Sequence, residues 1–301
     1  MNQGPNLFAD GKAYERLMGR WSRLAGEKFL DWLAAPKNLK WIDVGCGNGA
    51  FTEVLIARCL PAAVVGVDPS EGQIAYARTR PGAKLAEFRV AGAQDLPFAE
   101  NSFDAAAMAL VIVFVPDPAK AVAEMARVVR PGGIVATYMW DFPDGTPISP
   151  LGPAMKSLGM ATPERPNTEA AGRDAMRAIW RQAGLKSIET EVIRIRISYS
   201  SFDDFWESTT LPVGPSGKAL AALTPTAREQ LKARLRESLP IAADGTISYE
   251  AIANMAKGLG SVALMQSQGA ARGNSHIQRQ KTAGCTGSPR RLYSKKLSSH
   301  R

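Results

Sequence analysis

The sequence contains little histidine and little cysteine. Only two of its 301 residues are histidine, His276 and His300, and both lie near the C-terminal end. Residues 1–258 contain none, which argues against a histidine general base there. The three cysteines, Cys46, Cys59 and Cys285, show neither the spacing of a metal site nor that of a disulfide framework. We therefore predict a protein without a bound metal.

Long apolar runs are also missing. No stretch has the length needed to cross a membrane, and residues 1–10 lack the charged and apolar regions of a signal peptide. We therefore expect a cytoplasmic protein with no membrane span. Because 45% of the residues are hydrophobic, the chain can still bury one sizeable core.

Acidic residues are absent from the last part of the chain. Residues 259–301 contain eight Lys or Arg and no Asp or Glu, so almost all of the net charge of +9 comes from this segment. The segment is rich in Ser, Gly and Gln and lacks apolar periodicity, which is typical of a disordered tail. We interpret it as an aberrant extension of the chain. Since the rest of the chain is nearly balanced in charge, we expect no nucleic-acid partner.

The most informative stretch is residues 41–49, Trp-Ile-Asp-Val-Gly-Cys-Gly-Asn-Gly. Its short apolar run predicts a buried strand, three glycines follow at alternate positions, and residues 50–60 are typical of a helix. Glycine lets the chain turn sharply and lets a ligand come close, while a helix N-terminus carries partial positive charge. Strand, turn and helix together predict a pocket that accepts an anionic group.

Asp43 distinguishes two cofactor chemistries for this turn. The glycines, with Asp68 19 residues after Gly49, also satisfy the relaxed dinucleotide fingerprint, so the glycines alone fit both NAD and S-adenosylmethionine. A carboxylate two residues before the turn repels a pyrophosphate. It suits a ligand that carries both an ammonium and a carboxylate, such as an amino acid or its adenosyl conjugate. The alternative is that Asp43 only bonds the amides of its own loop.

The residues after the turn predict alternating strands and helices. Strands are expected at 64–68, 85–90, 103–110 and 134–140, and the continuous apolar run at 103–110 is typical of a strand buried on both faces. A helix is expected from Pro118 to about Arg130, where Pro-Gly-Gly stops it, with Asp117 as its cap. Asp68 ends its strand where a carboxylate can accept both hydroxyls of a ribose. A helix cap is the alternative for Asp68, although Ser70 is better placed for that role.

In this order, residues 41–49, 64–68, 93–98 and 116–133 resemble the motif series of class I S-adenosylmethionine-dependent methyltransferases. They are most similar to the small-molecule enzymes that include the ubiquinone and menaquinone C-methyltransferases. The resemblance covers residues 10–145 well and the rest weakly. It implies S-adenosylmethionine as the cofactor, with contacts from Asp43, Gly45, Gly47, Gly49, Asp68, Pro69, Ala93, Gln94, Val111, Arg20 and Tyr14.

The resemblance also implies a role for each part of the site. The three glycines face the methionine part, Asp68 holds the ribose, and Ala93 and Gln94 lie along the adenine edge. This family commonly has Asp where Gly92 stands. Either one adenine contact is therefore missing here, or Asp95 supplies part of it, unless Asp95 is only a turn or helix cap.

The N-terminal residues 14–22 resemble the helical lid of such enzymes. Arg20 is suited to fork onto the methionine carboxylate. Tyr14 and Trp21 are suited to close over the sulfonium, because aromatic faces attract cations. The alternative is an ordinary amphipathic helix with a surface arginine.

The C-terminal half predicts a substrate region. Residues 141–168 are rich in Pro and Gly and are expected to form a loop region, followed by helices at 169–183, 202–206 and 224–239. Strands are expected at 185–199, where apolar residues alternate with polar ones, and at 248–258. Met155, Phe205 and Trp206 are candidates for a substrate pocket, but core packing is the simpler interpretation of each.

No catalytic side chain is evident. Methyl transfer from a sulfonium is a displacement on an activated methyl group, so catalysis can depend largely on positioning. If a base is needed, Asp141 and Tyr138 lie at the end of a predicted strand and are weak candidates. The simpler interpretation of Asp141 is a solvated loop acid.

We therefore predict an α/β protein with a Rossmann-like, seven-stranded, mostly parallel sheet, helices on both faces, an N-terminal helical lid and a helical cap insertion. Its domain spans residues 1–258: lid 1–36, cofactor-binding core 37–145, and cap and last strands 146–258, before the tail 259–301. The predicted function is methyl transfer to a small apolar or aromatic molecule, and an NAD-dependent oxidoreductase is the alternative. A homodimer is a further expectation.

Overall fold

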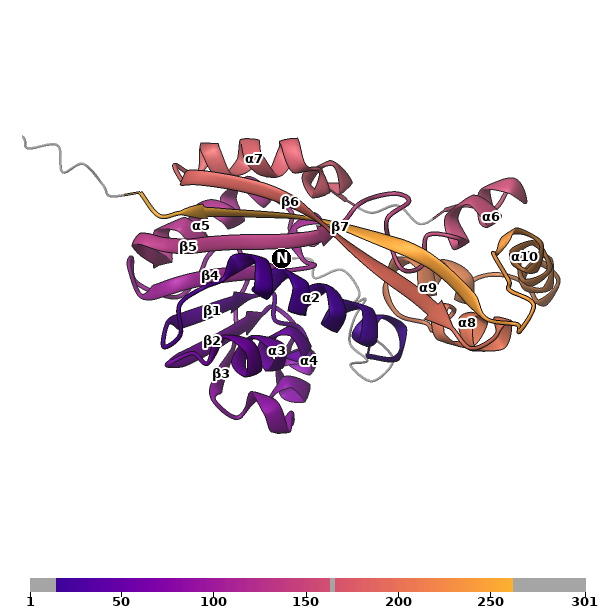
Figure 1. Cartoon of the computed structure of the whole chain (residues 1–301), viewed down its shortest axis with the longest axis horizontal. Coiled ribbons are helices and arrows are strands. Elements are labelled where there is room, and N and C mark those ends of the chain that lie inside the picture. The colour runs from indigo at the N-terminus through magenta and orange to yellow at the C-terminus, as the bar shows by residue number, and fades with distance from the viewer. Residues whose placement is uncertain (1–14, 163–165, 262–301) are drawn as a thin grey trace, which may run out of the picture. The chain divides into compact units, whose positions relative to one another are not determined.

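The chain folds into a mixed sheet whose larger part is parallel. The computed structural model describes residues 15–162 and 166–261, and within them the strands form one seven-stranded sheet in the order β3-β2-β1-β4-β5-β7-β6 (Figure 1). The strands are β1 (Lys40–Val44), β2 (Ala63–Asp68), β3 (Ala86–Val90), β4 (Phe103–Ala109), β5 (Val129–Trp140), β6 (Lys186–Tyr199) and β7 (Ile247–Leu259).

Strand direction confirms the predicted Rossmann-like sheet. Strands β1 to β5 pair in parallel, whereas β7 runs antiparallel to both β5 and β6. The central strand β4 is buried on both faces, as its apolar run predicts, and Ala105 to Met108 have no exposed surface. The carboxyl ends of β1, β2, β4 and β5 therefore meet at one edge of the sheet, where ligands bind in folds of this kind.

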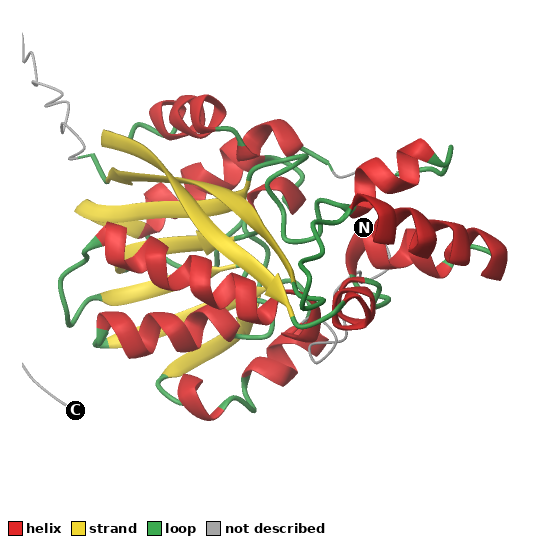
Figure 2. Ribbon diagram, turned by 45° about the vertical axis from the view of Figure 1, so that its right-hand side comes forward, coloured by secondary structure: helices red, strands yellow, loops and turns green. Residues whose placement is uncertain are grey.

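Helices cover both faces of the sheet (Figures 1 and 2). One face carries α2 (Arg20–Leu33), α3 (Ala50–Cys59) and α4 (Glu71–Ala77), and α2 packs on α3. The other face carries α5 (Pro118–Val128) and α7 (Arg173–Gln182), which pack on each other. These layers bury the central strands on both sides, whereas the edge strands β3 and β6 keep exposed residues.

A group of helices lies beyond the carboxyl end of β6 and the amino end of β7 (Figure 1). They are α6 (Leu151–Ser157), α8 (Phe202–Thr209), α9 (Gly214–Ala221) and α10 (Pro225–Ser238). We call this group the cap, and α10 packs on α6 within it. A single π-helical turn, η1 (Glu15–Gly19), precedes α2 and contacts α8.

The predicted caps of two helices are present. The Asp117 side chain accepts a hydrogen bond from the Lys120 amide at the start of α5, and Pro118 occupies its first position. The Ser70 hydroxyl accepts from the Gln73 amide at the start of α4, which is the role that the sequence assigns to it.

The predicted boundary between α5 and β5 is wrong. The helix ends at Val128, and β5 begins at Val129 rather than at residue 134. The sequence Arg-Pro-Gly-Gly at 130–133 therefore belongs to β5, with Gly132 at φ of +74°, and follows the end of the helix. The reason is tertiary pairing, since the Gly132 amide donates to the Gly260 carbonyl and the Gly260 amide donates to the Gly133 carbonyl, at the end of β7.

The cap contains two helices that the sequence did not predict. Helix α6 lies inside the region expected to be a loop, and α9 begins with Gly-Pro-Ser-Gly, which has low helix propensity. The helix expected at 169–183 is divided at Gly172 into the 3₁₀ turn η4 (Thr168–Ala171) and α7. Apolar burial supplied by neighbouring elements outweighs local propensity in these short helices.

The last two strands match their prediction closely. Ile193, Ile195 and Ile197 are buried along β6 while the residues between them are exposed, as the alternation predicts. Strand β7 covers the predicted 248–258 and ends at Leu259. Apart from residues 259–261, the segment predicted to be a tail lies outside the described residues.

Arg127 on α5 holds the loop that follows β3. Its guanidinium donates to the carbonyls of Phe98 and Leu96, and it also pairs with Glu124. Glu124 in turn accepts from the Leu96 amide at 2.9 Å. The fork of the guanidinium therefore fixes the backbone of residues 96–98 against α5.

We expect Arg127→Lys to destabilise the protein, because an ammonium cannot reach both carbonyls and Glu124 with the same geometry. The loss of charge-assisted hydrogen bonds predicts a decrease of about 1–2 kcal/mol in the free energy of unfolding, and of roughly 3–8 °C in Tm. Thermal unfolding measures this. The control is Arg23→Lys, whose exposed pair with Glu27 should contribute less than about 0.5 kcal/mol. Equal effects of both substitutions would contradict the anchoring role of Arg127.

Candidate functional site

The turn between β1 and α3 requires its three glycines for different reasons. Gly45, Gly47 and Gly49 have φ of +75°, +51° and +80°, a region that side chains disfavour. A Cβ at Gly45 would lie 2.6 Å from a methyl group of Val111. At Gly47, in contrast, no atom of the described residues lies within 4 Å of a Cβ position. Gly45 therefore packs against the end of β4, while Gly47 borders open space.

Asp43 is a fully buried carboxyl group just before this turn. Its Oδ2 accepts a hydrogen bond from the Thr52 hydroxyl at 2.6 Å, whereas Oδ1 has no partner among the described residues. Burial raises the pKa of Asp43 to about 7, against the hydrogen bond from Thr52 and with a smaller contribution from Asp68. The alternative in which Asp43 only bonds loop amides does not describe this geometry.

Asp68 binds the glycine turn from the end of β2. Its Oδ2 accepts from the Gly47 amide at 3.0 Å, and its Oδ1 accepts from the Ser70 amide at 2.9 Å. Burial raises the pKa of Asp68, although the bonds from Ser70 and Gly47 act against this. Pro69, which follows it, is exposed. The two acids therefore flank the turn, one at its start and one at its side.

The loop after β3 contains the remaining predicted cofactor residues of the core. Ala93 and Gln94 are partly buried, Gly92 and Asp95 are exposed, and the Ala91 amide donates to the Asp68 carbonyl. This bond brings the start of the loop next to the end of β2. A Cβ at Gly92 would meet nothing within 4 Å in the described part of the chain, so a larger residue would fit there.

The N-terminal candidates are only partly described. Tyr14 lies outside the described residues. Arg20 is exposed at the start of α2, and its guanidinium lies over the rings of Trp21 and Tyr199, 4.1 and 4.7 Å from their centroids. Trp21 is buried and packs edge-on against Tyr199. The charge of Arg20 also acts on the pKa of Tyr199 and on that of the Asp204 carboxyl, so both groups lie near its guanidinium.

The two candidate bases have structural partners. The Tyr138 hydroxyl donates to the Ser22 carbonyl at 3.3 Å, and its ring packs on Phe29. Asp141 Oδ1 accepts from the Asn254 side chain at 2.9 Å. Neither residue is among those that line the pocket described next.

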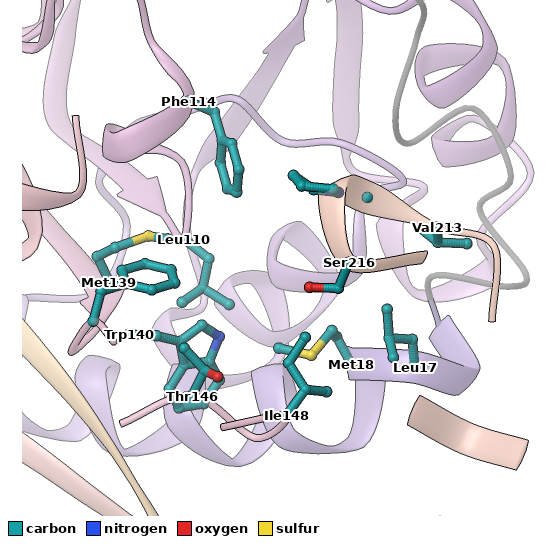
Figure 3. Close-up of a pocket in the computed structure, with 13 residues that line it drawn as sticks. Leu17, Met18, Leu110, Phe114, Met139, Trp140, Thr146, Ile148, Val213 and Ser216 are labelled. Atoms are coloured by element: carbon teal, nitrogen blue, oxygen red, sulfur yellow. The ribbon is translucent and has the colours of Figure 1, made fainter. Parts of the chain in front are cut away.

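An apolar pocket opens beside the glycine turn (Figure 3). About 550 Å³ of empty space lies between its walls, including space that is open to solvent. Leu110 lines it, and the next residue, Val111, covers Gly45, so the pocket and the turn share the end of β4. Thirteen residues line it: Leu17, Met18, Leu110, Phe114, Met139, Trp140, Phe142, Thr146, Ile148, Val213, Gly214, Pro215 and Ser216.

Sequence reasoning missed most of this lining. Met155, Phe205 and Trp206, which were considered for it, are buried and do not line the pocket, in agreement with the simpler core interpretation. Leu110 and Trp140 could have been found from their places at the ends of β4 and β5. No local signal marks the segments 17–18 and 213–216, because only the fold brings them together.

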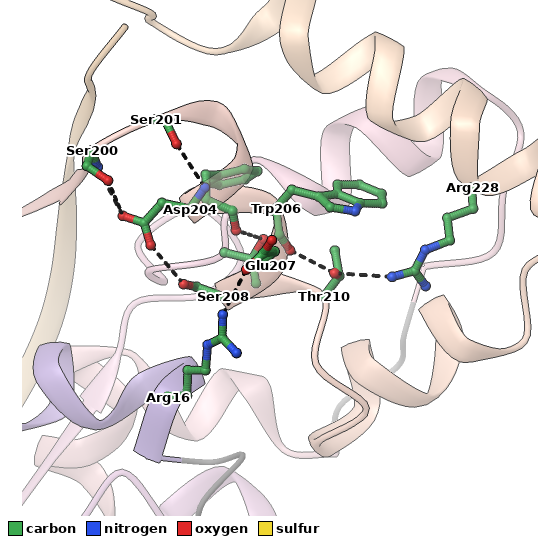
Figure 4. A network of polar contacts seen from close by, with 11 residues as sticks. Arg16, Ser200, Ser201, Asp204, Trp206, Glu207, Ser208, Thr210 and Arg228 are labelled. Carbon is green, nitrogen blue, oxygen red and sulfur yellow. Dashed lines mark hydrogen bonds and ion pairs between the residues drawn. The ribbon is translucent and has the colours of Figure 1, made fainter.

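A network of polar contacts in the cap includes an ion pair with the N-terminal turn (Figure 4). Arg16 of η1 binds Glu207 of α8 at 2.9 Å. On the same helix, the Asp204 carboxylate accepts hydrogen bonds from Ser200 and Ser208. Just after the helix, the Thr210 hydroxyl donates to the Trp206 carbonyl and accepts from Arg228. Of these contacts, the exposed Arg16–Glu207 pair joins η1, which carries two lining residues, to the cap, and the others lie within the cap.

Among the described residues, no group of three or more His, Cys, Asp or Glu is arranged to hold a metal ion. No helix in the described ranges is long and apolar enough to cross a membrane. Burial, followed by the charges of Asp43 and Asp68, raises the pKa of Cys46 well above its usual value, so this thiol stays protonated inside the turn.

Comparison with known proteins gives one consistent result. Residues 42–137 match the family model of the methyltransferase domain. The O-methyltransferase cnsE of Penicillium expansum is 35% identical over 162 residues, which are 52% of this chain and 55% of that protein. The O-methyltransferase rstn1 of Aspergillus nomiae is 31% identical over 179 residues, or 58% of this chain and 75% of that protein.

The matches differ in how much of each protein they cover. Across the first curated relatives, the chain spans about half of their length or less, from 24% to 55%. Among solved structures, the YcgJ protein of Bacillus subtilis aligns with a TM-score of 0.53 and 17% identity, covering 79% of this chain and 98% of that one. This likeness shows a shared fold.

We expect Gly45→Ala to destabilise the protein more than Gly47→Ala. Both substitutions place a side chain at positive φ, at a cost of about 1 kcal/mol, but only the first forces a methyl group into Val111. The predicted loss of free energy of unfolding is about 2–4 kcal/mol for Gly45→Ala and about 1 kcal/mol for Gly47→Ala.

Urea unfolding measures both effects. The double variant Gly45→Ala/Val111→Ala removes the two nearest methyl groups and should recover at least about 1 kcal/mol relative to additivity. Strict additivity would show that the close contact with Val111 is not the cause.

Asp43 predicts a pH dependence of stability. Its pKa is about 7 in the folded protein and about 4 in the unfolded chain, so between these values the folded state holds the proton that the unfolded chain has lost. The free energy of unfolding should therefore fall as the pH rises from about 4 to about 7, by up to about 1.4 kcal/mol per unit, and then level off.

The measurement is chemical unfolding at several pH values, for the wild type and for Asp43→Asn. Because Asn cannot ionise, the variant should lack this component and should gain stability over the wild type as the pH rises. A constant difference between the two proteins across the window would contradict the raised pKa.

Proposed function

Because this chain belongs to the class I S-adenosylmethionine-dependent methyltransferases, we propose that it transfers the methyl group of S-adenosylmethionine to a small apolar molecule bound in the pocket beside the glycine turn. The observation that carries this proposal is the orphaned, buried Oδ1 of Asp43 next to a glycine turn that leaves room for a ligand. Family membership does not support the NAD-dependent oxidoreductase alternative.

The residues around the turn fit the charges of the cofactor. Asp43 Oδ1 is proposed to bind the ammonium group, which would give this oxygen the partner that it lacks. The open side of Gly47 leaves room for the methionine part. Asp68 is proposed to accept the ribose hydroxyls with the lone pairs that the two loop amides leave free, and Pro69 lies next to it.

The other cofactor contacts are proposed along the same edge of the sheet. Ala93 and Gln94 are proposed for the adenine edge, with Val111 as a wall between the cofactor and the pocket. Arg20 is proposed to bind the methionine carboxylate through its guanidinium, and the contact from Tyr14 remains a prediction from the sequence. When bound, the cofactor supplies a methyl group on a positively charged sulfur that leaves as a neutral thioether.

The protein's own contribution is proposed to be positioning. The pocket walls hold the acceptor beside the turn. Asp141 and Tyr138 stay weak candidates for a base, since Asn254 and the Ser22 carbonyl bind them. Two relatives are named O-methyltransferases, which favours an oxygen acceptor; the proton of a hydroxyl would then pass to solvent water at the pocket's open side.

The first test is ligand binding. Isothermal titration should show binding of S-adenosylhomocysteine and none of NADH. Asp43 must be ionised to bind an ammonium group, so the affinity should rise with pH up to about 7, by at most about tenfold per unit, and then level off. Asp43→Asn should weaken binding by about 10–100-fold and remove this pH dependence.

The matched control is Asp31→Asn, which removes an exposed carboxylate paired with Arg58 on the surface. It should leave the affinity within about twofold. Binding of NADH alone, or an unchanged affinity in Asp43→Asn, would contradict the proposal. Turnover is then tested with S-adenosylmethionine and a panel of neutral phenols and quinones, by following S-adenosylhomocysteine and methylated product in a mass spectrometer.

A further inference from the structure

We propose that the methyl acceptor is an uncharged aromatic molecule with a hydrogen-bond-accepting oxygen, and that the indole N–H of Trp140 binds this oxygen. This inference rests on the proposed function and adds to it the chemical class of the substrate and a residue that selects it. Three observations carry it: an unpaired donor in the pocket wall, a second polar group facing the same space, and walls without charge.

Trp140 supplies the unpaired donor. Its side chain is 3% exposed at the end of β5, and its Nε1 finds no hydrogen-bond partner in the described part of the chain. An indole nitrogen can only donate, and a buried donor without an acceptor is unfavourable. Trp180 shows the usual arrangement, since its Nε1 donates to the Val135 carbonyl at 3.0 Å. An acceptor on a bound molecule would give Trp140 the partner that Trp180 already has.

Position separates Trp140 from the other unpaired indoles. Trp21 and Trp41 also have Nε1 atoms without a partner among the described residues, but neither side chain lines the pocket. In Figure 3 the nitrogen of Trp140 lies on the side of its ring that faces Ile148 and Ser216 across the pocket. The buried donor of Trp140 therefore lies on the pocket side of its ring, whereas the other two residues do not line the pocket.

Ser216 provides a second polar group on the opposite wall. It lies in the first turn of α9, and Figure 3 shows its hydroxyl pointing into the space between α9 and Trp140. The two groups come from different elements, β5 and the cap, so one molecule that reaches both would be held in a single orientation. Apolar walls with a few well-placed polar groups are typical of sites that bind small apolar molecules specifically.

The pocket walls that the structure describes carry no charged side chain, which disfavours an ionised acceptor. None of the thirteen lining residues is Asp, Glu, Lys, Arg or His in the described ranges 15–162 and 166–261. An ion in this pocket would lose hydration and gain no counter-charge. The rings of Phe114, Phe142 and Trp140 and the thioethers of Met18 and Met139 instead offer the contacts that aromatic molecules favour.

The experiment compares three probes that share one ring system. 2-Acetylnaphthalene carries an acceptor oxygen, 2-ethylnaphthalene replaces it with an apolar group of similar shape, and 2-naphthoate replaces it with a charge. Equilibrium dialysis of the full chain, with and without S-adenosylhomocysteine, measures the three affinities. The ketone should bind about five- to tenfold more tightly than the ethyl compound, and 2-naphthoate should bind more weakly than either.

The variants assign this preference to one atom. Trp140→Phe keeps an aromatic ring but removes the N–H, so it should bind the ketone and the ethyl probe within about twofold of each other. Trp41→Phe removes an equally buried, unpaired indole N–H on β1 and should keep the full preference. Ser216→Ala should reduce the preference in part. Thermal unfolding checks that each variant is folded.

Three results would overturn the inference: equal binding of ketone and ethyl probe by the wild type, a preference that persists in Trp140→Phe, or binding of 2-naphthoate as tight as that of the ketone. Failure of all three probes to bind would overturn it as well. The comparison of probes in the wild type needs no variant, so a variant that does not fold leaves the test intact. Failure to bind S-adenosylhomocysteine would overturn the proposed function separately, since the probes are also measured without it.

Discussion

The left-handed backbone at Gly45 is the constraint on which both parts of the site depend. At φ of +75° the turn leaves β1 so closely against β4 that a methyl group of Val111 would lie 2.6 Å from any Cβ there. Leu110, just before Val111, also has a positive φ of 60°, which is unfavourable for a leucine by about 1–2 kcal/mol. The bond from the Leu110 amide to the Tyr138 carbonyl holds it in this conformation. Leu110 lines the pocket and Val111 covers the turn, so one strained corner joins the two regions.

The two buried acids beside the turn, Asp43 and Asp68, favour a bound cation. Asp43 is buried with one hydrogen bond, and Asp68 lies close enough to raise its pKa further. Two buried carboxyl groups disfavour each other's ionisation. A bound ammonium would offset both the desolvation of the carboxylates and the repulsion between them. The positive end of the α3 helix dipole favours the opposite charge at the start of that helix. A zwitterionic ligand therefore matches the site better than an anion or a cation alone.

The parallel part of the sheet could be predicted from the sequence because its signals are local. The buried run at 103–110, the caps Asp117 and Ser70, and the glycine turn each specify their own segment, and the structure has all of them. Long-range pairing decided the features that were missed. Residues 130–133 belong to β5 because Gly132 and Gly133 pair with Gly260, some 130 residues later in the chain. Helices α6 and α9 contain Gly and Pro and form where the neighbouring elements bury their apolar side chains.

The pocket, too, is formed by segments that lie far apart in the sequence. Its walls come from η1, the ends of β4 and β5, the loop at 142–148 and the start of α9, and no periodicity in the sequence relates these segments. The rule that ligands bind at the carboxyl ends of parallel strands identifies the residues at the ends of β4 and β5. It does not identify the residues that η1 and the cap contribute. The proposed reaction is compatible with walls that come from separate segments. A displacement on an activated methyl group depends more on the distance and direction of the acceptor atom than on a base. Walls without charge can therefore serve both purposes: they select the acceptor by its polarity, and by fixing its position they supply most of what the reaction requires.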